Sequence, residues 1–224
     1  MLLPMLLFIF LISAVSFAEN APLNAPAIAL PPAQVIMKAC ADMGVDAVDM
    51  AYVKSKLPDM LNKTGNVFVI DARPARNYDA GHIPTAYNMY DAKFNLLFPK
   101  FEALNLPKDT EIILGVGRPC PMSLNDAKKL KEKGYTNLKA FVKGPVFVET
   151  MPLEVTVKGA KGYLSDGYLI NAAVDTSLEK FKSDAPAKDK PVVIAGGSYA
   201  DAQKVYEMGY KMVFFYNGAA ADTQ

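Results

Sequence analysis

The segment EIILGVGRPCPMS, residues 111–123, has the composition and spacing of a loop that could hold a nucleophile against an anion. Its apolar run predicts a buried strand that ends at Gly115, and Ser123 opens a charged helix. Cys120 lies between them, two residues after Arg118. Because a helix start and a cationic neighbour both stabilise a thiolate, Cys120 is a candidate nucleophile or redox thiol.

Two other interpretations of Cys120 are open at this point. The chain has two cysteines, so Cys40 and Cys120 could form one disulfide in an oxidising compartment. Cys120 could instead be a small apolar residue packed beneath the loop. The cysteine spacing matches no zinc site and His82 is the only histidine, so we expect no metal and no other cofactor.

The same loop could hold an anion with its backbone amides. Gly115 and Gly117 can adopt the φ values that a ring of converging N–H groups requires. Pro119 and Pro121 donate no N–H, which weakens such a cradle, and an ordinary strand-to-helix loop is the alternative. The residues predicted to surround the anion are Gly115, Val116, Gly117, Arg118 and Ser123.

The elements that must position this loop can be predicted from the hydrophobic pattern. Residues 67–70 and 111–114 are continuously apolar, which is typical of parallel strands buried on both faces, and residues 136–145 predict a third strand. Helical patterns cover residues 31–44, 46–65, 92–104 and 124–135. Strands that alternate with helices predict an α/β fold with a mostly parallel sheet.

The second half of the sequence repeats the order of predicted elements of the first half and matches it at some residues. KDTEIILG at 108–115 matches KDKPVVIA at 188–195, and DAKKLKEKGYTNLKAF at 126–141 matches DAQKVYEMGYKMVFFY at 201–216. The second copy has shorter connections, so we expect two related α/β units with the second reduced. Its aromatic cluster most simply belongs to the core, with a binding face as the alternative: Tyr206, Tyr210, Phe214, Phe215 and Tyr216.

The segments DARPARNYDAGHIPTAYNM and EIILGVGRPCPMSLNDAKKLKEKGYTNLKAF together resemble the rhodanese family. The resemblance covers residues 45–150 well and residues 160–219 weakly. It implies a parallel sheet flanked by helices, with an anion site in the loop at the carboxyl ends of the strands. It also implies sulfur transfer through a cysteine persulfide, which is the chemistry of the family.

The sequence departs from that family at the reacting residue. The family's nucleophilic cysteine stands at the end of the second strong strand, where this chain has Gly115 and its second copy has Ala195. The resemblance leaves Asp71, Arg73 and His82 as supporting residues. We expect Arg73 to pair with a nearby acid such as Asp71, and His82 to shape its turn through the backbone.

The first 18 residues form an uncharged apolar run that ends in small residues at the spacing a signal peptidase accepts. The run is short for a membrane span, so we expect export to the periplasm or beyond, with an uncleaved anchor as the alternative. After cleavage no stable membrane span is expected. The expected organisation is a signal peptide (1–18), a Pro/Ala-rich linker (19–34), a rhodanese-like domain (35–152) and a reduced second unit (153–224).

The function expected from the sequence has two forms. The net charge of +1, without a basic stripe, argues against nucleic-acid binding. The first form is a non-catalytic or regulatory module that binds a small sulfur oxyanion or a partner protein. The alternative is a sulfurtransferase or thiol redox protein, in which the Cys120 thiolate attacks the outer sulfur of a donor such as thiosulfate. A persulfide forms on Cys120, and its outer sulfur then passes to a thiol-bearing acceptor or to cyanide.

Overall fold

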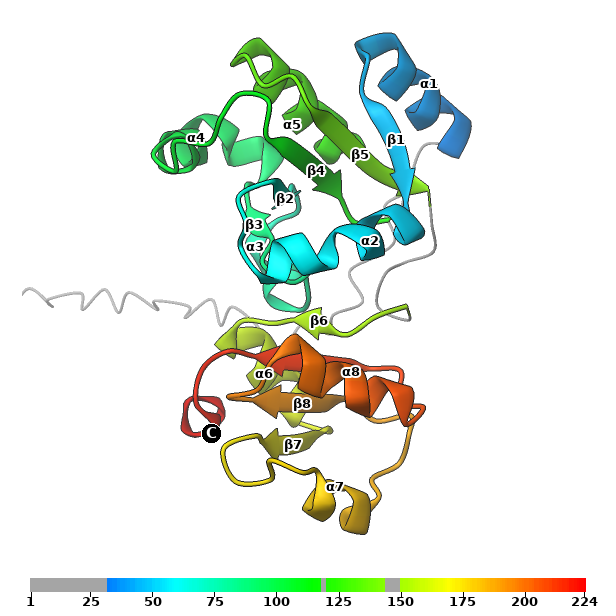
Figure 1. Cartoon of the computed structure of the whole chain (residues 1–224), viewed down its shortest axis with the longest axis vertical. Coiled ribbons are helices and arrows are strands. Elements are labelled where there is room, and N and C mark those ends of the chain that lie inside the picture. Colours follow the sequence, from blue (N-terminus) through cyan, green and yellow to red (C-terminus); the bar gives the residue numbers. More distant parts are fainter. Residues whose placement is uncertain (1–31, 118–119, 144–149) are drawn as a thin grey trace, which may run out of the picture.

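The computed structural model describes residues 32–117, 120–143 and 150–224. Over these residues the chain folds into two units, one above the other in Figure 1, and each unit is built on its own parallel sheet. The predicted signal segment, the predicted linker as far as residue 31, and Arg118 lie outside the described residues. No helix within the described ranges is long and apolar enough to span a bilayer.

The first unit contains a five-stranded sheet in the order β1-β5-β4-β2-β3, in which every neighbouring pair is parallel. Its strands are β1 (Asp46–Asp49), β2 (Val67–Asp71), β3 (Tyr87–Asn88), β4 (Glu111–Gly115) and β5 (Leu138–Lys143). Its helices are α1 (Ala33–Met43), α2 (Met50–Leu61), α3 (Ala75–Asp79), the 3-10 helix η1 (Asp91–Lys93), α4 (Phe94–Glu102) and α5 (Pro121–Glu132). Buried residues of α1, α4 and α5 cover one face of the sheet, and those of α2 belong to the cluster on the other face.

The second unit is smaller and has a four-stranded sheet in the order β6-β9-β8-β7, again with parallel neighbours. Its strands are β6 (Leu153–Glu154), β7 (Tyr168–Asn171), β8 (Val192–Ala195) and β9 (Val213–Tyr216). Its helices are α6 (Val157–Leu164), α7 (Glu179–Asp184), α8 (Tyr199–Glu207) and the 3-10 helix η3 (Ala220–Thr223). Strand for strand, this order corresponds to β1-β5-β4-β2 of the first sheet, and the described residues contain no counterpart of β3.

The predicted buried strands are confirmed, and β4 shows why its sequence is apolar throughout. Ile112, Ile113 and Leu114 are each 0% exposed. Ile113 faces one hydrophobic cluster, whereas Ile112 and Leu114 face the cluster beneath α4 and α5. A strand covered on both faces needs apolar side chains at successive positions rather than alternate ones. The α/β fold expected from the sequence is therefore the fold observed.

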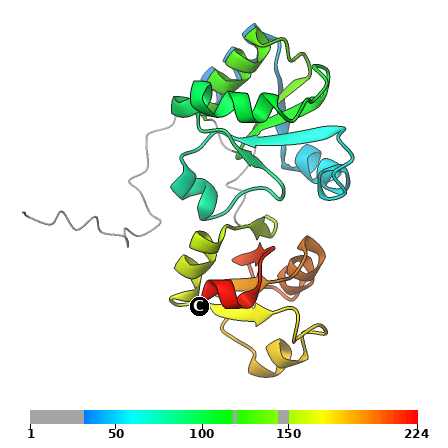
Figure 2. The same ribbon diagram turned by 90° about the vertical axis from the view of Figure 1, so that its left-hand side faces the viewer.

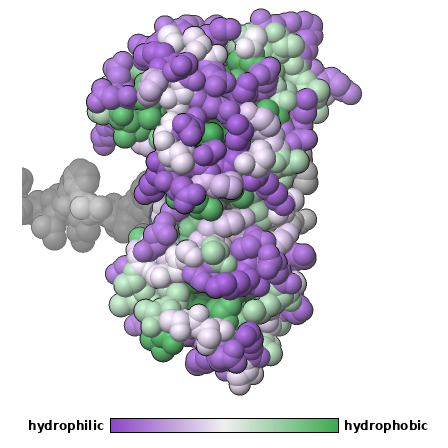
Figure 3. Space-filling view, in the orientation of Figure 1, coloured by the Kyte–Doolittle hydropathy of each residue, from purple (hydrophilic) through white to green (hydrophobic). Residues whose placement is uncertain are grey.

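The aromatic residues of the second unit are mainly core residues, as predicted. Tyr210 and Phe215 are buried between the second sheet and its helices α7 and α8. Phe214, on the opposite face, is stacked on Tyr163 of α6 with ring centroids 3.8 Å apart. Hydrophilic residues dominate the face shown in Figure 3, where apolar residues form scattered patches.

One predicted element is wrong at its start. The helix predicted over residues 46–65 is preceded by β1, which pairs with β5 at the edge of the sheet. The helix α2 begins only at Met50, because the Asp49 carboxylate accepts the Tyr52 N–H at 2.9 Å and so caps it. Helices α2 and α4 both run through a proline, Pro58 and Pro99 respectively.

Candidate functional site

The end of β4 explains why this position of the loop is a glycine. Gly115 has a φ of +125°, which side-chain-bearing residues rarely adopt. A Cβ atom built on Gly115 would lie 2.6 Å from the backbone oxygen of Phe141 in the neighbouring strand β5. The position where the family resemblance implies a nucleophilic cysteine therefore has neither the backbone conformation nor the space for a side chain in this structure.

The loop after Gly115 is held against β5 by its own backbone. The Gly117 N–H donates to the Phe141 carbonyl at 3.1 Å, and Gly117 has a φ of +86°. Val116 is 3% exposed and belongs to the hydrophobic cluster on the α2 side. The Gly117 amide, which the sequence assigned to an anion cradle, is thus already used. This bond depends on the register of β4 and β5, which the loop sequence does not encode.

The start of α5 differs from the equivalent helix of the second unit. Cys120 is its N-cap residue but makes no side-chain capping bond, and Pro121 is at the first helical position. At α8, by contrast, Ser198 and Asp201 form a complete capping box. Asp201 accepts from both the backbone and the hydroxyl of Ser198 at 3.0 and 2.8 Å. No side chain among the described residues caps the first helix terminus, whereas the chain itself caps the second.

The state of the two cysteines excludes one of the alternatives for Cys120. Both Cys40 and Cys120 are free thiols, so the disulfide alternative is wrong. Cys120 is 3% exposed, as a thiol packed beneath the loop would be and unlike an accessible nucleophile. Cys40, on the buried face of α1, is 1% exposed, and burial raises the pKa of its thiol.

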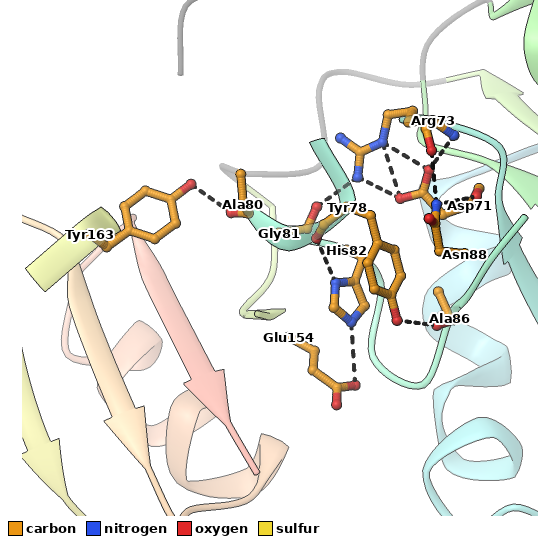
Figure 4. Close-up of polar contacts among 10 residues, drawn as sticks. All are labelled: Asp71, Arg73, Tyr78, Ala80, Gly81, His82, Ala86, Asn88, Glu154 and Tyr163. Carbon is orange, nitrogen blue, oxygen red and sulfur yellow. Dashed lines mark hydrogen bonds and ion pairs between the residues drawn. The ribbon is translucent and has the colours of Figure 1, made fainter. Parts of the chain in front are cut away.

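Asp71 and Arg73 form a compact ion pair at the end of β2, as predicted (Figure 4). The Arg73 side chain donates to both oxygens of Asp71, with the shorter contact at 2.6 Å from Nη2. The same Nη2 atom donates to the Gly81 carbonyl at 2.7 Å. Asn88 donates its amide to the carbonyls of Asp71 and Arg73. These bonds fix the turn between β2 and β3.

His82 also shapes its turn, as expected. It is 3% exposed, and its ring is stacked on that of Tyr78 with centroids 3.7 Å apart. Its Nδ1 atom lies 2.8 Å from the Tyr78 carbonyl oxygen, and Tyr78 donates its own hydroxyl to Ala86 at 2.7 Å. Burial lowers the pKa of His82, and the nearby Glu154 carboxylate opposes this effect.

Asp126 is the polar residue that the sequence analysis missed. It lies on the same face of α5 as Ser123 and Leu130, is 0% exposed, and neither carboxylate oxygen has a hydrogen-bond partner among the described residues. Burial, and then the negative charge of Asp91, raise its pKa to about 8. Lys129 partly offsets this effect, with its Nζ atom 3.9 Å from Asp126 and hydrogen-bonded to Asp91.

Within the same described residues, no group of three or more histidine, cysteine or acidic side chains could hold a metal ion. The Asp91–Asp126 pair already has a cationic neighbour in Lys129. A helical charge pattern normally indicates a solvated face. The spacing of Asp126, three residues after Ser123 and four before Leu130, was the only signal that could have identified it as buried.

Comparison with known proteins finds one family model that matches most of the first unit. Residues 53–145 match the family model of the Rhodanese-like domain. A rhodanese-like domain from Anabaena sp. is similar at 20% identity and a TM-score of 0.34, covering 44% of this chain and 67% of that one. A human single-domain sulfurtransferase is similar at 20% identity and a TM-score of 0.34, covering 45% and 92%.

A longer solved structure is also similar. The thiosulfate sulfurtransferase from Pseudomonas aeruginosa matches 86% of this chain and 47% of its own length, at 11% identity and a TM-score of 0.39. The curated proteins contain no match to this chain. The family-model match covers β2 to β5, which are the strands that carry the loop and the Asp71–Arg73 pair.

Proposed function

We propose that the rhodanese-like domain over residues 53–145 binds a small sulfur oxyanion and does not transfer sulfur. One observation carries this proposal: at Gly115, where the family resemblance implies the nucleophile, a Cβ atom would lie 2.6 Å from the Phe141 carbonyl oxygen. A cysteine there would have to displace the backbone of a central strand. The loop can therefore keep its observed geometry only if no cysteine stands at position 115.

The open terminus of α5 supports an anion as the ligand. The first N–H groups of a helix have no partner within the helix, and the helix dipole adds partial positive charge at that end. No side chain among the described residues caps this terminus. Such a site favours an oxyanion. Because the Gly117 amide is bonded to Phe141, the remaining predicted participants are Gly115, Val116 and Ser123, together with Arg118, which the sequence places in the same loop.

The alternative function is sulfur transfer through a persulfide on Cys120. Its N-cap position on α5 favours it, because thiolates are stabilised at helix N-termini. In that reaction the thiolate attacks the outer sulfur of thiosulfate, the S–S bond breaks, and sulfite leaves with the electron pair. The 3% exposure of Cys120 argues against this attack, because the donor cannot reach the sulfur without opening the loop.

The proposal extends to the chain as a whole. The second unit is interpreted as a reduced repeat of the first, supported by the matching strand order and by the sequence echo. Its own helix terminus is occupied by Asp201, so it is not proposed to bind an anion. Residues 1–18 are proposed to direct export, and a partner protein is a second class of ligand for the loop.

We expect thiosulfate and sulfate to raise the melting temperature without leaving sulfur on the protein. A ligand at one hundred times its dissociation constant stabilises by about 2.7 kcal/mol, which shifts the melting temperature by several degrees. Differential scanning fluorimetry measures the shift, with chloride at equal ionic strength as the control. The variant Arg118→Ala should reduce it, because it removes the charged donor.

Intact-mass analysis after thiosulfate treatment separates the two functions. The binding proposal predicts an unchanged mass in the wild type and in Cys120→Ser. A gain of one sulfur that Cys120→Ser abolishes would establish the persulfide alternative instead. An oxyanion that shifts neither the melting temperature of the wild type nor that of Arg118→Ala would remove the anion-binding proposal.

A further inference from the structure

The two units meet at a short contact that we call the joint, formed by residues 79–86 of the first unit and 153–163 of the second (Figures 1 and 2). Across it His82 and Glu154 form an antiparallel bridge. The His82 N–H donates to the Glu154 carbonyl at 3.0 Å, and the Glu154 N–H donates back at 3.1 Å. The Tyr163 hydroxyl donates to the Ala80 carbonyl at 2.7 Å (Figure 4).

The two units are closely packed at the joint. A Cβ atom on Gly159 would lie 1.8 Å from the Asp79 carbonyl oxygen, so α6 approaches α3 at backbone contact distance. The Thr156 hydroxyl donates to the Asp79 carboxylate at 3.0 Å. A single apolar cluster includes Ile83 of the first unit and Leu153 and Phe214 of the second. The two units therefore share part of one core.

The carboxylate of Glu154, a residue of the second unit, contacts the first unit. Its side chain is 17% exposed, and its Oε2 atom accepts the Thr85 N–H at 2.7 Å. Its Oε1 atom accepts from the side-chain amide of Asn217. Thr85 has a φ of +67°, a conformation uncommon for a residue with a branched side chain. Thr85 therefore has an uncommon backbone conformation at the point where its amide donates to Glu154.

The hydrogen bonds of His82 determine where a proton can bind to it. Nδ1 lies 2.8 Å from the Tyr78 carbonyl oxygen, which can only accept, so Nδ1 carries the hydrogen of the neutral ring. Nε2 is then unprotonated, and it lies 3.9 Å from Oε2 of Glu154 (Figure 4). Any proton that His82 takes up is placed on Nε2, facing the carboxylate of the other unit.

The other charged groups around His82 are already engaged. Asp71 is paired with Arg73, and Asp79 accepts from Thr156. Tyr78, stacked on the ring, donates to Ala86, and burial raises its own pKa. Glu154 is therefore the carboxylate that a protonated His82 would face across the joint.

We propose that the joint is acid-sensitive, with His82 and Glu154 as its sensor: a proton bound to Nε2 loosens the second unit from the first. Because burial disfavours the charged ring, an open joint binds this proton more tightly than a closed one. Closure is therefore strongest above the ordinary histidine pKa of about 6.5 and weakens as pH falls through the lower pKa of the buried ring. Glu154 limits this weakening of the joint, because its carboxylate pairs with the protonated His82 ring. This inference does not depend on anion binding.

The chain has one histidine, so its ring protons can be followed by NMR without competing histidine signals. We expect His82 in the wild type to titrate below 6.5. In Glu154→Gln its pKa should fall further, by about half a pH unit or more, because a unit charge 3.9 Å away is removed. The matched control Glu179→Gln changes an exposed acid of α7 and should leave the titration unchanged. Equal values in the wild type and Glu154→Gln would overturn the proposal.

Hydrogen exchange tests the opening itself in the wild type, whatever the stability of Glu154→Gln. The protection factor of the Thr85 amide reports closure, because that amide bonds to Glu154 across the joint. It should fall severalfold from pH 7 to pH 5 in the wild type and remain constant in His82→Gln, in which no ring titrates. A Thr85 protection factor that is independent of pH in the wild type would equally overturn the proposal.

Discussion

Replacing Gly115 with alanine should destabilise the protein by about 2–4 kcal/mol, a large effect for one methyl group. Roughly 1–2 kcal/mol comes from placing a side-chain-bearing residue at a φ of +125°. The rest comes from the Cβ atom, which would lie 2.6 Å from the Phe141 carbonyl oxygen. Strand β5 pairs with both β1 and β4, so its backbone cannot move aside without disturbing two ladders.

Gly134 supplies the matched control for this prediction. It has a φ of +87°, but a Cβ atom there would meet nothing within 4 Å. Gly134→Ala should therefore show the conformational cost alone, about 1 kcal/mol. Urea unfolding of both variants measures the difference, which reports the contact with Phe141. If the two variants lose equal stability, the close approach of β5 to Gly115 is not real.

The same geometry predicts the outcome of restoring the family's nucleophile. Gly115→Cys should lose stability like Gly115→Ala and gain no sulfurtransferase activity with thiosulfate and cyanide. The sulfur would be attached to a Cβ atom that has no room. Gained activity would show that the loop can rearrange to the catalytic form, and would contradict the binding-only proposal.

The fold was predictable wherever the signal was local. The apolar runs of β2 and β4 specify strands covered on both faces, and α1 ends at Gly44, where glycine adopts the left-handed conformation. Strand β1 was not predictable, because DAVD has only one fully buried side chain, Val48. Its strand conformation depends on pairing with β5, whose paired residues are 93 or 94 positions further along the chain.

Short-range contacts of the candidate site residues were predictable, whereas long-range contacts were not. The Asp71–Arg73 pair and the backbone role of His82 follow from short sequence separations, and both are confirmed. The Gly117 bond to Phe141 and the approach of Glu154 to His82 arise from tertiary packing between distant segments. Charge alone also misleads, because Asp126 is in a lysine-rich helix yet is fully buried.

Replacing Asp126 with asparagine should stabilise the protein at neutral and alkaline pH. The carboxyl group is 0% exposed and has a pKa of about 8, against about 3.9 in an unfolded chain. The folded state therefore holds a proton that the unfolded state has already released. At about 1.4 kcal/mol per pH unit, this costs roughly 4 kcal/mol of stability at pH 7. The new amide offsets part of the gain, so we expect about 2 kcal/mol net.

The pH dependence distinguishes this cause from a simple repacking effect. Because the folded pKa is raised, the contribution of Asp126 is fully present below about 3.9 and is lost as pH rises through about 8. The advantage of Asp126→Asn should grow across that window and become constant above it. Glu132→Gln, an exposed change on the same helix, should show no such growth. A constant advantage for Asp126→Asn from pH 5 to pH 9 would mean that Asp126 does not hold a proton. The helix that begins at the proposed anion site would then carry a buried, ionised carboxylate beside Lys129.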